Sequence, residues 1–130
     1  MKTNRVISIL LGASLIGFFA GYYLLRIYDC DASISCYDLT TKAYALYYGM
    51  GALSAVHALL LFFPQAFNTW KKFAIWFVPL TTIMFLFQDD KGAGLFLVTA
   101  RETFLWASAI YVAISTVIIA TSWYKTRPQK

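Results

Sequence analysis

The side chain in this sequence most capable of chemistry is His57, the only histidine. It lies inside the uncharged run that begins at Ala43, at a depth of roughly 21 Å of helical rise. We expect Ser14 and Thr116 at a similar depth in neighbouring helices. The simpler interpretation is a neutral histidine hydrogen-bonded to such a hydroxyl. The alternative is a proton relay or ligand site, although a relay requires more than one titrating group.

Two cysteines are the second chemical feature, and five residues separate them. Cys30 and Cys36 fall in a predicted loop outside the cytoplasm, where thiols tend to oxidise, so we predict a structural disulfide. The alternative is a redox role. Membrane disulfide oxidoreductases with four spans use a Cys-x-x-Cys pair plus a second pair, and this sequence has neither.

Catalytic patterns are missing from the sequence. It contains no His-Glu-x-x-His, nucleophile elbow, phosphate loop or cysteine–histidine metal cluster. No acidic residue lies inside a predicted span, whereas an intramembrane carboxylate usually marks a proton-coupled transporter. Small multidrug exporters have this size but depend on a glutamate in the first helix, and the run 6–25 holds none. We therefore predict a protein that is not an enzyme and that needs no cofactor or metal.

The composition is that of a membrane protein. Of the 130 residues, 60% are hydrophobic and 13% are charged, whereas a soluble domain carries about 25% charged residues. The net charge of +5 comes from lysines and arginines beside apolar runs, which suits anionic lipid headgroups and not nucleic acid. At this length we expect one integral membrane domain, 1–130.

Four apolar runs approach the length needed to cross a bilayer. The third is the shortest, with roughly 24 Å of helix, but Lys71 and Lys72 can snorkel and Trp70 can sit at headgroup level. A signal peptide is the alternative for the first run, which is longer than a usual signal core and has no clear Ala-x-Ala site after it. The predicted spans are 6–25, 43–63, 73–88 and 103–124.

Prolines and one apolar linker divide these runs. Pro64 should end the second helix and begin a loop that reaches Lys72. Pro79 should kink the third helix, with one of the two threonines that follow it satisfying the freed backbone. The stretch 92–100 is too short to span, so we expect an interfacial helix there, or else the first turns of the fourth helix.

The distribution of charge predicts the topology. Seven of the eleven lysines and arginines fall on the side of both termini, and all six acids fall on the other side with seven tyrosines. By the positive-inside rule both termini are cytoplasmic. We interpret the tyrosines as an aromatic belt first and a recognition surface second. The fold class is all-α, an up-down-up-down four-helix transmembrane bundle in a cell membrane, which we take to be a bacterial inner membrane.

Small residues at helical spacing predict where the helices meet. Lipid is as apolar as leucine, so close backbone approach must drive helix association. We expect Ala13, Gly17 and Gly21 to pack inside one bundle or to form the seam of a homo-oligomer. The third helix carries large aromatics, so we expect it at the periphery. In the second helix we expect Gly49 to pack against a neighbour. In the fourth helix we expect Ala113 to do so, as part of a stripe of small residues at helical spacing: Ala109, Ala113, Thr116 and Ala120.

The run from Trp70 to Pro79, Trp-Lys-Lys-Phe-Ala-Ile-Trp-Phe-Val-Pro, with Arg101-Glu102 opening the last helix, resembles small four-span bacterial membrane proteins of unassigned function. The resemblance implies no activity. We predict a non-enzymatic protein that acts by binding another membrane component or a second copy of itself. The alternative is an oligomeric channel or small transporter, for which a water-accessible cavity near His57 would be the evidence.

Overall fold

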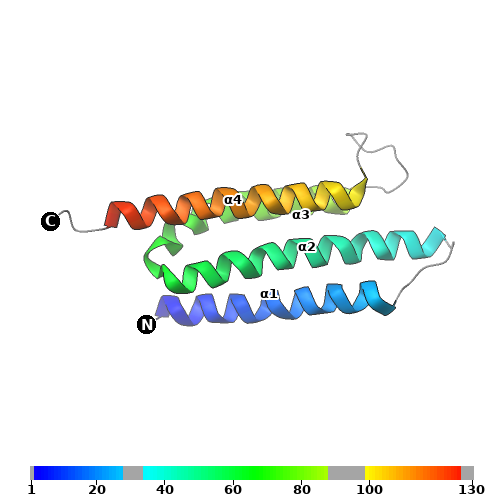
Figure 1. Ribbon diagram of the computed structural model, residues 1–130, viewed down its shortest axis with the longest axis horizontal. Helices are drawn as coiled ribbons and strands as arrows, with labels where there is room; N and C mark the ends of the chain where they lie inside the picture. The colour runs from blue at the N-terminus through cyan, green and yellow to red at the C-terminus, as the bar shows by residue number, and fades with distance from the viewer. Residues whose placement is uncertain (1, 28–33, 88–98, 127–130) are drawn as a thin grey trace.

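The computed structural model describes residues 2–27, 34–87 and 99–126, with side chains for 3–27, 39–87 and 99–126. This part of the chain forms four long α-helices that lie side by side as a bundle (Figure 1). Each helix is long and apolar enough to cross a membrane. The elements are α1 (Lys2–Ile27), α2 (Ile34–Phe62), the 3₁₀ turn η1 (Pro64–Ala66), α3 (Phe67–Phe87) and α4 (Ala100–Thr126).

The connection between α2 and α3 is shorter than the sequence suggested. α2 ends at Phe62, just before Pro64, because proline cannot continue the hydrogen-bond ladder. The expected loop to Lys72 is wrong, since η1 leads directly into α3. Proline suits the first position of a helical turn, where its missing N–H is not needed. Lys71 and Lys72 are consequently exposed on the second turn of α3.

In Figure 1, α2 lies between α1 and the overlapping pair α3 and α4. α1 packs on α2, α2 also packs on α4, and α3 packs chiefly on α4. Helices that follow one another in the chain run antiparallel. Ser14 of α1 lies beside His57 of α2, for example, and Gly21 lies beside Tyr47. The start of α1 and the end of α4 therefore share one end of the bundle, the terminal end. The opposite end, where α1 stops and α4 begins, is called the distal end.

The tightest crossing joins α1 to α2. A Cβ placed on Gly21 would lie 2.7 Å from the backbone N of Tyr47 and 2.9 Å from its Cα, closer than real Cβ atoms come. The two backbones approach this closely only because glycine has no side chain. Gly17, one turn earlier, faces the side chain of Met50. Both glycines thus pack within the bundle, while Ala13 is exposed.

α4 packs through large side chains and not through its small-residue stripe. Its buried face carries Phe104 and Tyr111, whose ring centroids lie 4.5 Å from Phe85 and 5.4 Å from Phe77. α4 therefore meets α3 through ring contacts. The prediction that the small-residue stripe faces inward is wrong. All four of its members are exposed: Ala109, Ala113, Thr116 and Ala120.

The proline inside α3 is followed by two threonines that bond back to the helix. Thr81 Oγ1 shares its one hydrogen between the carbonyl oxygens of Phe77 and Val78, both at 3.0 Å. Thr82 Oγ1 donates to the Val78 carbonyl oxygen at 2.8 Å. Hydroxyls often satisfy backbone groups near a proline in an apolar helix. The bonds fall on the turn that contains Pro79.

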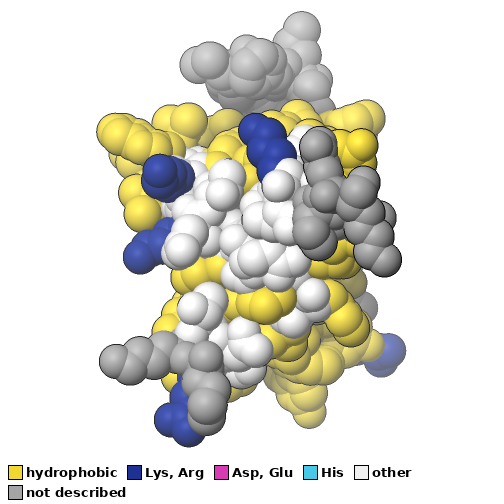
Figure 2. Space-filling model, turned by 90° about the vertical axis from the view of Figure 1, so that its left-hand side faces the viewer, with side chains coloured by type: hydrophobic (Ala, Val, Ile, Leu, Met, Phe, Trp, Pro, Cys, Tyr) yellow, Lys and Arg dark blue, Asp and Glu magenta, His cyan; other side chains and the backbone are white. Residues whose placement is uncertain are grey.

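The terminal end of the bundle is basic. Figure 2 looks at this end and shows Lys and Arg side chains around its rim, with no acidic side chain among the residues described. The exposed cations there are Arg5, Lys71, Lys72 and Lys125. The positive-inside rule was applied to this same clustering of lysines and arginines near the two termini. The cytoplasmic placement of both termini stays a prediction.

Candidate functional site

Each of the four helices contributes one polar side chain to a buried cluster between the middle of the bundle and its terminal end. Ser14, His57 and Trp70 are 4% exposed and Ser115 is fully buried. A polar group at this depth that lacks a hydrogen-bond partner costs about 1–3 kcal/mol. The four side chains, which we call the polar cluster, must therefore satisfy one another or the backbone.

His57 is held between α1 and α3. Its Nδ1 lies 3.5 Å from Ser14 Oγ, which itself donates to the Leu11 carbonyl oxygen at 2.9 Å. A hydroxyl has a single hydrogen, so the contact with His57 requires the proton on Nδ1. On its other side the imidazole meets the ring of Trp70 edge to face, with centroids 5.3 Å apart.

Trp70 completes the cluster, although we expected it at headgroup level. Its indole Nε1 donates to Ser115 Oγ at 3.3 Å. Because α3 begins at Phe67, Trp70 lies within the helix and faces the bundle. Thr116, the other predicted partner of His57, is exposed and donates to the Val112 carbonyl oxygen at 2.8 Å. The inward position belongs to Ser115, which the sequence analysis did not select.

The polar cluster contains one titrating side chain, His57. Among the described residues, no three histidine, cysteine, aspartate or glutamate side chains gather as metal ligands would. Hydrogen bonds from α1 to α2 and from α3 to α4 converge on the His57–Trp70 ring contact. The arrangement is suited to holding the four helices in register.

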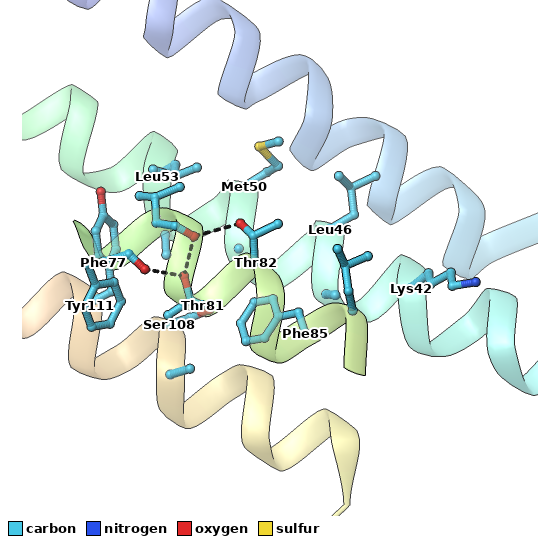
Figure 3. A pocket seen from close by; sticks show the side chains of 16 residues that line it. Lys42, Leu46, Met50, Leu53, Phe77, Thr81, Thr82, Phe85, Ser108 and Tyr111 are labelled. Carbon is cyan, nitrogen blue, oxygen red and sulfur yellow. Dashed lines mark hydrogen bonds between the residues drawn. The ribbon is translucent and has the colours of Figure 1, made fainter. Parts of the chain in front are cut away.

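A groove opens between α2, α3 and α4 on the distal side of this cluster (Figure 3). Its cavity volume is about 270 Å³. The groove exists because α2 and α3 each pack on α4 but touch each other little. Gly49 adds width, since a Cβ there would meet only the ring of Phe85, at 3.7 Å. We call it the α2–α3 groove, and its apolar wall includes Leu46, Met50, Leu53, Phe77 and Phe85.

Hydroxyl groups interrupt the apolar wall of the groove. Those of Thr81 and Thr82 are used by the backbone of α3. Ser108 Oγ is buried and has no hydrogen-bond partner within the part of the chain described. The Tyr111 hydroxyl is also buried and lies near Ser115 and Trp70, without meeting the geometry of a full hydrogen bond to either. Both residues come from α4 and line the groove (Figure 3). These two residues therefore bring hydroxyl groups to the wall of an otherwise apolar space, and both oxygens are covered by neighbouring atoms.

A third feature, the distal hollow, lies at the distal end. Its cavity volume is about 450 Å³. Arg26 Nε donates to the Tyr22 hydroxyl at 3.2 Å, and Arg101 Nε donates to the Tyr48 hydroxyl at 3.4 Å. Part of the predicted aromatic belt therefore forms the wall of a polar concavity. The hollow is lined by Tyr22, Leu25, Arg26, Tyr44, Tyr47, Tyr48 and Arg101.

Two sequence-based predictions fall outside the described residues. Cys30 and the side chain of Cys36 are not among them, so the disulfide stays a prediction. The same holds for most of the stretch 92–100, of which Ala100 is the first residue of α4.

Comparison with known proteins finds no match to a family model, to a curated protein or to a solved structure. The resemblance to four-span bacterial proteins consequently identifies no family. The structure defines the class: an all-α bundle of four helices, each a candidate membrane span, which indicates a multi-pass membrane protein in contact with lipid.

Proposed function

We propose that this protein is a non-enzymatic membrane protein that binds another membrane component in the α2–α3 groove. The observation that carries the proposal is the apolar groove itself, in whose wall the buried Ser108 hydroxyl has no hydrogen-bond partner within the described part of the chain. A hydrocarbon tail cannot satisfy this hydroxyl. A ligand that supplies a polar atom to it recovers about 1–3 kcal/mol.

The chemistry of the groove favours a lipophilic molecule that carries a hydrogen-bonding oxygen. Small-molecule sites are concave and mainly apolar, with a few placed polar groups, and have volumes of roughly 300–1,000 Å³. The groove is concave and mainly apolar, and its volume of about 270 Å³ lies just below that range. Its volume is too small for a whole partner helix, which is about 10 Å wide or more with its side chains. A partner helix could insert only a side chain.

The polar cluster supports this function over the alternative of a channel or small transporter. Such a protein requires a polar path near His57. His57 is 4% exposed and lines neither the groove nor the distal hollow. A dry histidine packed between Ser14 and Trp70 suits a structural role, and we retain the channel only as the competing hypothesis.

The test is native mass spectrometry of the full chain, purified from its own membrane in mild detergent. Gly49→Leu should fill the groove, because a side chain there has room to extend past the ring of Phe85. Gly12→Leu is the matched control, since a Cβ on Gly12 meets nothing within 4 Å. We expect a bound component on the wild type and on the Gly12 variant, and its loss from the Gly49 variant.

The outcomes separate the possible occupants. A small added mass identifies a lipophilic ligand, whereas an added mass equal to this chain identifies a second copy. A Gly49→Leu protein that is folded, judged by an unchanged melting temperature, and still carries the component would contradict binding in the groove. A wild-type protein with no bound component would count against the function itself.

A further inference from the structure

The distal hollow brings two arginines together from helices on either side of α2. Arg26 stands at the end of α1 and Arg101 at the start of α4, and α2 contributes three tyrosines between them. The two cations lie far apart in the sequence and share one polar concavity of about 450 Å³. Clustered positive charge at the end of a membrane span lies at the depth of lipid headgroups.

The tyrosines hold both guanidinium groups in place. Each Nε donates to a tyrosine hydroxyl, that of Tyr22 or Tyr48. The guanidinium of Arg101 also lies 5.6 Å from the ring centroid of Tyr44, and that of Arg26 lies 5.8 Å from the ring centroid of Tyr22, as in cation–π contacts. The terminal Nη groups carry the remaining donors of each guanidinium. A tyrosine hydroxyl that accepts from arginine keeps its own hydrogen to donate.

From this geometry we infer that the distal hollow binds a phosphate group, carried by an anionic phospholipid headgroup. Arginine presents parallel N–H donors that match two phosphate oxygens at once, and such charge-assisted bonds are roughly twice as strong as neutral ones. Both guanidiniums line the same hollow and are held by tyrosines, so both can donate to a phosphate bound there. Within the described part of the chain the single acidic side chain is that of Glu102, which is exposed and does not line the hollow.

The inference is independent of the proposed function. The distal hollow and the α2–α3 groove share no lining residue. Filling the groove with Gly49→Leu should leave phosphate binding unchanged, so failure at one site is distinguishable from failure at the other.

The test measures the affinity of the full chain in detergent micelles for phosphatidylglycerol, with phosphatidylcholine as the neutral-headgroup reference. The double variant Arg26→Gln/Arg101→Gln should bind phosphatidylglycerol at least about tenfold more weakly, because it removes two charge-assisted forks. The matched control is Arg5→Gln/Lys125→Gln, which removes the same charge from exposed positions at the terminal end. The control should bind as the wild type does.

Two further arms sharpen the outcome. Arg26→Lys/Arg101→Lys keeps the charge and loses the planar forks, so it should bind nearly as weakly as the glutamine variant. Wild-type affinity in the lysine variant would overturn recognition by paired forks, as would equal loss in the terminal-end control. In the second arm, inorganic phosphate is added as a competitor of phosphatidylglycerol. If the phosphate does not displace the lipid, the lipid headgroup is supported as the ligand. If it displaces the lipid from the wild type and does not bind the glutamine variant, the hollow is assigned to soluble phosphate and the lipid is overturned as the source.

Discussion

Replacing Gly21 with alanine tests the crossing of α1 and α2 most directly. The added Cβ would lie 2.7 Å from the backbone N of Tyr47. Because this atom belongs to a helix backbone, no side-chain rotation can relieve the clash, and the helices must separate. Gly17 offers a graded comparison, since a Cβ there would lie 2.7 Å from Met50 Cγ, an atom of a flexible side chain.

The expected magnitude is the difference between two opposing effects. Overpacking a well-packed contact costs about 1–3 kcal/mol, and separation of two helix backbones belongs at the upper end of that range. Alanine in place of glycine within a helix stabilises it by about 1 kcal/mol. We therefore expect Gly21→Ala to lower the free energy of unfolding by about 1–2 kcal/mol. Gly12→Ala, with nothing within 4 Å of its Cβ, should raise it instead.

The assay is reversible unfolding in mixed micelles, followed by circular dichroism, on the wild type and the three alanine variants. The expected order of stability is Gly12→Ala, then wild type, then Gly17→Ala, then Gly21→Ala. Detergent-resolved mass should show the same oligomeric state for all four proteins, because the contacts at Gly17 and Gly21 are internal to one chain. A Gly21→Ala protein as stable as Gly12→Ala would refute the close-crossing argument.

Three further predictions address the polar cluster, the topology and the cysteines. Trp70→Phe should cost about 1–3 kcal/mol in unfolding free energy, because it strands the Ser115 hydroxyl; Trp76→Phe, at an 82% exposed position, is the control and should change little. A reporter that folds only in the cytoplasm should be active when fused to the carboxyl terminus, and a silent but well-expressed fusion would refute the predicted topology. Thiol labelling should modify Cys30 and Cys36 only after reduction, and labelling of the untreated folded protein would rule out the disulfide.

The number and place of the helices could be predicted because a membrane span must be apolar and must close its own backbone hydrogen bonds. The residues at which the helices begin and end were harder to predict. The pair Lys71-Lys72 looks like a boundary, since charges usually flank a span. Exposed lysines can instead snorkel from within a helix. The two lysines are therefore compatible with a helix that begins earlier, at Phe67, and that places Trp70 inside the bundle.

The rotation of each helix about its axis was harder to predict from the sequence than its position in the chain. In lipid both faces of a span are apolar, so hydrophobic periodicity points to no particular side. Ser115 and Thr116 differ by about 100° around α4, and only the first faces the polar cluster. The spacing of Tyr111, Ser115 and Ile119, four residues apart, was a usable signal for the buried face. The groove could not be predicted either, because it depends on the small contact between α2 and α3. No local sequence pattern determines how closely two helices pack.

The two halves of the bundle differ in how their polar groups are used, and this difference is the strongest argument for binding in the distal half. In the polar cluster, Ser14 and Trp70 bond to partners on the protein itself. In the groove wall, Ser108 Oγ is buried without such a partner within the described residues. A bundle selected only for stability would be expected to carry alanine at this position, because alanine fills it without the penalty. The proposal that a ligand in the groove completes this hydrogen bond accounts for the serine, and it leaves the cluster around His57 with a structural role.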